Sequence, residues 1–199
     1  LYDHGMVDIN EKDEITIETL SGIKKLKAYT SGGKVNRLRV DMGKAILDPK
    51  EIPVVLDGDK VVDRPVKIAG KSYNITCVSM GNPHCVVFMD DIDNLDIETV
   101  GPEFENDKLF PERVNTEFVT VLDDHTIKMR VWERGSGETW ACGTGACAVA
   151  VAACENGFCK KGEDIKIKLK GGDLIINYTD ETVYMTGNAE KVFEGEVEV

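Results

Sequence analysis

One cysteine, Cys142, stands directly before a glycine-rich turn and an alanine-rich segment. The turn is Gly143-Thr144-Gly145, and small residues continue to Asn156, which predicts a helix that begins at Gly143. The first backbone N–H groups of a helix lack internal partners and carry partial positive charge, so they can hold a carboxylate or a phosphate. The same charge favours a thiolate. We therefore expect an anion-binding turn beside a cysteine whose pKa is lowered and which, in the complete parent protein, alkylates faster than the other five cysteines.

Two other kinds of site deserve comparison with this one. A nucleotide-binding loop is disfavoured, because neither the Gly-x-Gly-x-x-Gly spacing after a strand nor a Gly-Lys-Ser/Thr sequence is present. A cysteine-dependent acyl-transfer site needs a histidine base, and His84 is available, so this alternative stays open. We expect the remaining cysteines to be small buried residues, and none has the Cys-x-x-Cys spacing of a structural zinc site: Cys77, Cys85, Cys147, Cys154 and Cys159.

The composition of the 199-residue chain limits the classes of function. Apolar residues make up 42% and charged residues 30%, as in a soluble globular protein. The net charge of −12 argues against binding to nucleic acids or anionic membranes, which requires basic patches. No apolar run approaches the roughly 18 residues of a membrane span. The cysteines have the positions of small buried residues rather than those of disulfide partners, which favours free thiols in the reducing cytoplasm.

The elements that must position the turn are mostly strands, so we predict an α+β fold. Hairpins are expected around Ser21-Gly22 and around Asp123–His125, and a three-strand meander over 164–187. Further strands are expected over residues 34–43, 66–70, 73–80, 84–89 and 189–199.

Two helices and one helical end are predicted. The helix over 143–156 is apolar nearly all round, so it belongs inside the curve of a sheet. A second helix should begin at an Asp96 cap and end at Phe110-Pro111, with a kink at Gly101-Pro102. Gly5 reads as the C-cap of a helical turn.

Three motifs resemble the diaminopimelate epimerase family. They are "ERGSGETWACGTGA" from Glu133, "MGNPHCVVF" from Met80 and "FPERVNTEFV" from Phe110, in the order of that family. The stretches "LYDHG" and "GNAEKVFEGEVEV" resemble further parts of the family sequence, so the resemblance spans the chain. Proline racemases share the Cys-Gly-Thr-Gly turn, but "ERGSGET" and Asn-Pro-His favour the diaminopimelate branch.

The resemblance implies a fold of two similar lobes, each a curved, mostly antiparallel sheet wrapped around a central helix. Residues 1–41 would be a remnant of the N-terminal lobe and 42–186 the C-terminal lobe, with its central helix near 143–156. Residues 187–199 would return to the N-terminal lobe as a strand. The apolar side chains of this partial N-terminal lobe would then lack part of their core, among them Ile15, Ile17, Leu26, Val192 and Phe193.

The resemblance also implies the chemistry. The family interconverts LL- and meso-diaminopimelate without a cofactor, using two cysteines on opposite faces of the α-carbon; one removes the proton and the other delivers one. Cys142 matches one of these cysteines, Glu133 the acid beside it and His84 the partner of the opposite cysteine. The substrate-binding positions are Asn82, Asn115, Glu133, Arg134, Gly143 and Thr144.

The family's first cysteine, in a Cys-Gly-Asn-Gly motif, does not occur in this sequence. We therefore expect the 199-residue chain to be inactive by itself, although its parent would be an epimerase and, by resemblance, a cytoplasmic homodimer. No metal, nucleic acid or membrane is expected to bind. Two alternatives remain: a relative acting on proline or hydroxyproline, and a non-catalytic binding or assembly module.

Overall fold

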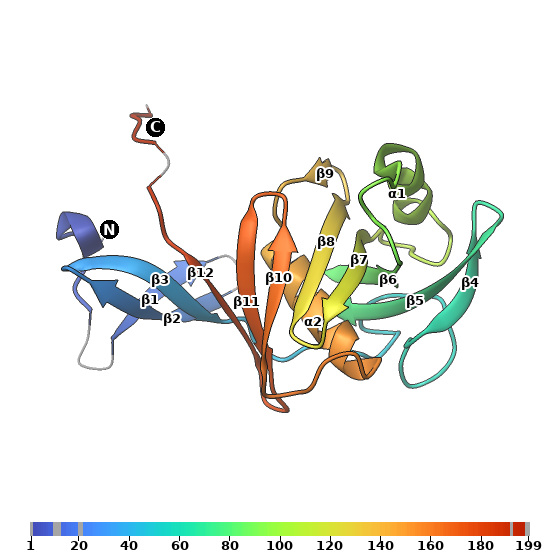
Figure 1. Ribbon diagram of the computed structural model, residues 1–199, viewed down its shortest axis with the longest axis horizontal. Helices are drawn as coiled ribbons and strands as arrows, with labels where there is room; N and C mark the ends of the chain where they lie inside the picture. The colour runs from blue at the N-terminus through green and yellow to red at the C-terminus, as the bar shows by residue number, and fades with distance from the viewer. Residues whose placement is uncertain (1, 10–12, 20–21, 192, 198–199) are drawn as a thin grey trace. The chain divides into compact units, whose positions relative to one another are not determined.

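The computed structural model describes residues 2–9, 13–19, 22–191 and 193–197 and divides into two units along the chain. One unit is Met42–Met185, and the other joins Leu1–Asp41 with Thr186–Val199. Figure 1 shows the elements of each unit. The turn before the alanine-rich segment belongs to Met42–Met185, which is called the helix-containing unit below.

A mostly antiparallel sheet forms the frame of the helix-containing unit. Its strand order is β4-β5-β6-β7-β8-β10-β11-β12, and β9 pairs with β8. The β6–β7 and β8–β10 pairs are parallel. The strands are β4 Arg64–Ile68, β5 Lys71–Ser79, β6 Pro83–Phe88, β7 Asn115–Asp123, β8 Thr126–Glu133, β9 Gly137–Thr139, β10 Asp164–Leu169, β11 Gly172–Tyr178 and β12 Val183–Asn188. The predicted hairpin at Asp123–His125 and the meander of β10, β11 and β12 are confirmed.

The predicted central helix is α2, Gly143–Glu155. It is buried without interruption from Gly145 to Ala153 and packs against β5, β6, β7, β10 and β11. Small side chains allow the surrounding strands to approach on all sides, which a helix with no polar face requires. The α+β class and the sheet wrapped around a central helix are therefore confirmed (Figure 1).

Both faces of the central strands are buried. Val86, Val119 and Val131 face the core that contains α2, whereas their neighbours Val87 and Phe118 belong to a second core on the other face. Successive side chains of a strand point to opposite faces, so this alternation assigns every residue of β6, β7 and β8 to one side. Polar residues in phase with Val86, Val119 and Val131 must face α2.

The second core is covered by α1, Ile97–Glu105. The expected cap is confirmed, because Asp96 accepts a hydrogen bond from the Thr99 N–H at 3.3 Å. The predicted end at Phe110 is wrong: Asn106 closes the helix, and both its backbone and its side-chain amide donate to the Pro102 carbonyl. These bonds satisfy carbonyl groups that a longer helix would have used. Pro102 is accommodated inside the helix.

The other unit contains a three-strand antiparallel sheet and a short 3-10 helix. The elements are η1 Tyr2–His4, β1 Glu14–Thr19, β2 Gly22–Ser31 and β3 Lys34–Asp41, with β2 in the middle. The predicted β1–β2 hairpin is confirmed. Gly5 follows η1 with φ of 65° and donates to the Tyr2 carbonyl, as a helix-ending glycine does.

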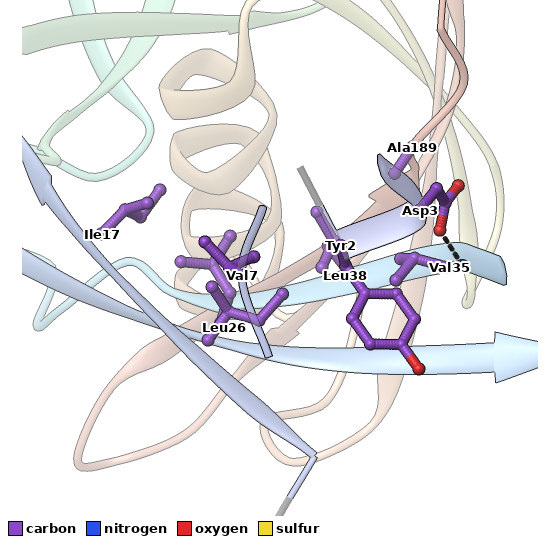
Figure 2. A pocket seen from close by; sticks show the side chains of 9 residues that line it. Tyr2, Asp3, Val7, Ile17, Leu26, Val35, Leu38 and Ala189 are labelled. Atoms are coloured by element: carbon purple, nitrogen blue, oxygen red, sulfur yellow. Dashed lines mark hydrogen bonds between the residues drawn. The ribbon is translucent and has the colours of Figure 1, made fainter. Parts of the chain in front are cut away.

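An apolar cavity of about 280 Å³ opens in this three-strand unit (Figure 2). Ile15, Ile17 and Leu26 line it, and the Asp3 carboxylate accepts a hydrogen bond from the Val35 N–H at its edge. Ile17 is 37% exposed and Phe193 is 83% exposed, as expected for an incomplete core. The expectation is wrong for Leu26, which is buried by its neighbours, and Val192 lies outside the described residues.

The strand predicted for 189–199 is not found in its described part, 189–191 and 193–197. Strand β12 ends at Asn188. Phe193 and Val197 remain more than four-fifths exposed, at 83% and 86%. An alternating pattern becomes a strand only where a neighbouring strand supplies hydrogen bonds, and the described residues of this segment pair with no strand.

Replacing Gly101 by alanine is expected to destabilise the helix-containing unit. A Cβ atom at Gly101 would lie 2.3 Å from Cδ2 of Trp132, so the indole would have to move. Overpacking of this kind costs about 1–3 kcal/mol in the free energy of unfolding, which urea denaturation measures. The control is Thr99→Ala on the exposed side of α1, expected to stay within about 0.5 kcal/mol. Equal stability of the two variants would contradict this packing of α1 on β8.

Candidate functional site

Cys142 is the N-cap residue of α2. Its backbone is extended, with φ of −135° and ψ of 108°, and its sulfur accepts a hydrogen bond from the Gly145 N–H at 3.4 Å. The sulfur also lies 3.6 Å from the Thr144 hydroxyl oxygen. The side chain is only 6% exposed, because α2 starts inside the sheet. The predicted thiol therefore stands at the mouth of a buried helix rather than on a surface.

A path of polar contacts leads from the sulfur to His84. The side-chain amide of Asn82 donates to the Thr144 hydroxyl at 3.4 Å, and its carbonyl oxygen lies 3.0 Å from His84 Nε2. His84 is the second residue of β6, in phase with Val86, so its ring faces α2 and is fully buried. The structure thus brings four of the predicted site residues into one network, although they come from two separate stretches of the chain.

Glu117 is a member of this network that the sequence analysis missed. It lies in the middle of β7, in phase with Val119, and is fully buried. One of its carboxyl oxygens lies 2.7 Å from His84 Nδ1. The sequence contained a signal for this residue: Glu117 directly precedes the apolar run "FVTV", in phase with Val119, where a lone carboxyl group requires a partner.

Glu133 ends β8 and faces the α2 side, in phase with Val131. Its carboxylate accepts a hydrogen bond from the Thr139 hydroxyl at 2.5 Å, across the β8–β9 pair. The carboxylate is close enough to Cys142 to raise the pKa of the thiol. Glu133 is therefore near the sulfur and held in one orientation.

Asn115 and Arg134 form a second contact group at the ends of β7 and β8. The Asn115 amide donates to the Pro83 carbonyl at 3.1 Å, and its oxygen accepts from the Arg134 N–H at 3.0 Å. The Arg134 guanidinium donates to the Glu112 carbonyl at 2.9 Å. Through Pro83, this group joins the same turn that carries Asn82 and His84.

The expected low pKa of Cys142 is wrong. Burial raises the pKa of the thiol to about 12, and the Glu117 and Glu133 carboxylates add to the rise. Hydrogen bonds with the Thr144 hydroxyl and the Gly145 N–H lower the pKa, as expected at a helix start, but their effect is smaller than that of burial. The reason is that the helix start is dry and shares its space with carboxyl groups, both of which disfavour a thiolate.

The two N–H groups before Gly145 remain available to a ligand. In the described part of the chain, no acceptor is given for the backbone N–H of Gly143 or Thr144. Gly143 is also crowded, because a Cβ there would lie 3.1 Å from the Met185 sulfur. Free N–H groups at a helix start can bind a carboxylate, and Cys142 lies beside them as a proton donor.

The six cysteines are free, and Cys77, Cys85, Cys147 and Cys159 are buried as expected, whereas Cys154 is half-buried. Among the residues described, no three histidine, cysteine or acidic side chains gather in a way that could hold a metal ion. No helix formed by the described residues reaches the length and hydropathy that a membrane crossing needs.

Sequence comparison gives one family. The family model described as diaminopimelate epimerase matches residues 76–192. A protein named diaminopimelate epimerase from Agathobacter rectalis is 50% identical over 208 residues, which cover all of this chain and 71% of the relative. Relatives of the same name from Acetivibrio thermocellus and Methanococcus maripaludis are 50% and 48% identical, with 70% and 71% of their lengths covered.

Structural comparison gives the same fold at low identity. A probable proline racemase from Agrobacterium radiobacter matches with a TM-score of 0.71 at 15% identity, over 94% of this chain and 61% of that one. A hydroxyproline epimerase from Agrobacterium vitis matches with a TM-score of 0.68 at 14% identity, over 94% and 60%. This chain therefore spans about three fifths of each of those two proteins, and the likeness concerns the fold alone.

The raised pKa of Cys142 predicts slow alkylation. At neutral pH the folded chain should react with iodoacetamide at Cys142 roughly tenfold or more slowly than the urea-unfolded chain, because the thiolate is the reactive form. The rate should climb with pH towards about 12. Mass mapping of labelled peptides measures this, and the unfolded chain is the control. Labelling of Cys142 ahead of Cys159, whose pKa is raised only to about 11, would contradict the prediction.

The same shift predicts a loss of stability in alkali. The pKa of Cys142 is higher in the folded chain than its ordinary value of 9.0. Its contribution to the free energy of unfolding is therefore complete below about pH 9 and is lost as the pH rises towards 12. Cys142→Ser should lessen the fall in the free energy of unfolding between these pH values. An identical alkaline slope in the variant would mean that Cys142 ionises as easily folded as unfolded.

Proposed function

The chain belongs to the diaminopimelate epimerase family, a family of isomerases, and from this premise we propose that its site acts in the inversion of the α-carbon of diaminopimelate between the LL and meso forms. The observation that carries the proposal is the Cys142 sulfur at the N-cap of α2, close to Glu133 and beside two N–H groups that have no acceptor among the described residues. The Cys142 thiol, which can carry a proton, therefore lies beside the N–H groups of Gly143 and Thr144, which can bind a carboxylate and are called the cradle below.

The cradle holds the substrate by its α-carboxylate. The N–H groups of Gly143 and Thr144 donate hydrogen bonds to this carboxylate. The positive end of the helix dipole stabilises the negative charge that spreads onto the carboxylate when the α-proton leaves. The dry surroundings of α2 strengthen this interaction. Asn82, Asn115 and Arg134 bind the distal amino-acid end, for which a planar guanidinium and two amides are suited.

Cys142 starts the reaction as a thiol. It gives its proton to one face of the α-carbon, so the S–H bond breaks as the new C–H bond forms, and the sulfur is left as a thiolate. The reverse direction uses that thiolate as the base. Glu133 relays the proton to and from the sulfur, and His84 serves the opposite cysteine.

Inversion also needs a group on the opposite face that removes the original proton. Cys147 is the cysteine nearest to Cys142 along α2, but it belongs to the same helix and is fully buried. It cannot reach the far face of a substrate held at the helix start. We therefore propose that the 199-residue chain does not complete the inversion by itself.

A second substrate class has a specific observation in its favour. The solved structures with the two TM-scores of 0.71 and 0.68 are named as a proline racemase and a hydroxyproline epimerase. Diaminopimelate remains the preferred substrate, because relatives at 50% identity carry that name. A non-catalytic module that only binds the amino acid is the third alternative. A homodimer and a cytoplasmic location complete the proposal on the family resemblance alone.

The test is exchange of the substrate α-proton in heavy water. The chain alone is expected to show neither deuterium incorporation with inversion nor turnover of LL-diaminopimelate. A fusion to the segment of the Agathobacter rectalis relative that this chain does not cover should restore both. Cys142→Ala in the fusion should lower the rate by roughly a hundredfold or more, because a positioned acid or base contributes at least that much.

Three outcomes would contradict parts of this proposal. Inversion by the unfused chain would refute its inactivity. A fusion that epimerises proline or hydroxyproline but not diaminopimelate would support the second substrate class. Binding without exchange in the fusion, measured by calorimetry, would support the non-catalytic module.

A further inference from the structure

Glu117 occupies a position that needs a specific explanation. It is a carboxyl group with no exposed surface, on a central strand whose inward neighbours are Val119 and the apolar helix α2. A charged carboxylate in such surroundings is costly unless it is paired and fully hydrogen-bonded. An apolar residue would fit the core better, so the carboxyl group must serve a local purpose.

Its two oxygens are in different situations. Oε1 lies 2.7 Å from His84 Nδ1, whereas Oε2 is buried and has no hydrogen-bond partner among the described residues. A full negative charge would leave Oε2 unsatisfied in a dry place. A neutral pair, in which the carboxyl group and the imidazole share one proton, avoids that cost.

The neighbouring contacts determine where that proton lies. The Asn82 amide donates to Thr144 through Nδ2, so its oxygen faces His84 Nε2 at 3.0 Å. An amide oxygen only accepts, so Nε2 carries a hydrogen. A second hydrogen must then lie between Nδ1 and Glu117 Oε1, whichever of these two atoms holds it, because two bare acceptors would repel at 2.7 Å.

Gly145 makes room for this arrangement. A Cβ atom at this position would lie 2.6 Å from Glu117 Oε1 and 3.2 Å from the Cys142 sulfur. The carboxyl group and the thiol therefore approach the same backbone atom in the first turn of α2. The glycine is needed here for close packing, since its φ is not positive.

We propose that Glu117 is a positioning residue of the proton-transfer site: by sharing one proton with His84, it fixes the imidazole so that Nε2–H faces Asn82, and thereby orders Thr144 beside Cys142. This assignment rests on the proposed function for its catalytic meaning, but the proton arrangement itself requires no substrate. Glu117 acts through His84 and does not touch the reacting carbon.

The experiment is nitrogen-15 and proton NMR of the histidine rings in the 199-residue chain. His84 is assigned by loss of its signals in His84→Gln, because His4 and His125 are exposed. The wild type should show a ring proton on the Nδ1 side that is protected from exchange with water. Glu117→Gln should abolish it and leave Nδ1 unprotonated, since a glutamine amide donates to Nδ1 instead.

The matched control is Glu155→Gln, which makes the same change at the other end of α2. Glu155 is hydrogen-bonded to Lys60 and Tyr178, well separated along the helix from Cys142. It should leave the His84 signals unchanged, whereas a general loosening of the fold would alter them in both variants. If Glu117→Gln does not fold, the wild-type spectrum alone decides.

Two results would overturn the proposal. One is a wild-type His84 whose Nδ1 is unprotonated and has no protected proton beside it. The other is an equal change in Glu155→Gln and Glu117→Gln. Neither measurement involves turnover, so a failure of the epimerase assignment would appear separately, as an inactive fusion with an intact His84 signature.

Discussion

Helix α2 has no polar face, and the rest of the helix-containing unit follows from the need to cover it on every side. Nine successive residues, from Gly145 to Ala153, are buried. A flat sheet could cover only one side of such a helix, so the sheet that supplies β5, β6, β7, β10 and β11 must curve around it. Small side chains keep the helix thin enough to be enclosed. The same constraint places the start of the helix, with its unpartnered N–H groups, inside the protein rather than in water.

The alternation of side chains along the strands then selects the residues that meet this helix start. His84 is in phase with Val86, Glu117 with Val119 and Glu133 with Val131, and all three valines pack in the core of α2. The parallel pairing of β6 with β7 and the antiparallel pairing of β7 with β8 bring these positions into adjacent strands. Polar side chains that are far apart in the sequence converge because each one points from its strand towards α2.

The sequence was sufficient for most of the fold because its signals are local. The alternating strands, the Asp96 cap and the small-residue helix depend on residues near one another in the chain, and each is found in the structure. The early end of α1 depends on a local cap at Asn106, which the sequence pattern did not reveal. The missing strand after Asn188 depends on tertiary hydrogen bonds, which no local pattern encodes. For the site, the positions of Cys142, His84 and Asn82 were predictable from their motifs. The role of Glu117 and the direction of the Cys142 pKa shift were not, because both depend on burial and on which carboxyl groups share the space.

Burial has two opposite effects at Cys142, and the balance between them fits the proposed chemistry. A dry site raises the pKa of the thiol, so the sulfur holds its proton when no substrate is bound. A thiolate formed there is for the same reason a stronger base than an ordinary one, which is what removal of a weakly acidic α-proton requires. The dry site also strengthens the pull of the Gly143 and Thr144 N–H groups on a substrate carboxylate. At a solvent-exposed helix start the pKa of the thiol would be lower and the N–H groups would bind the carboxylate more weakly. Such a site would have both a weaker base and a weaker interaction with the substrate.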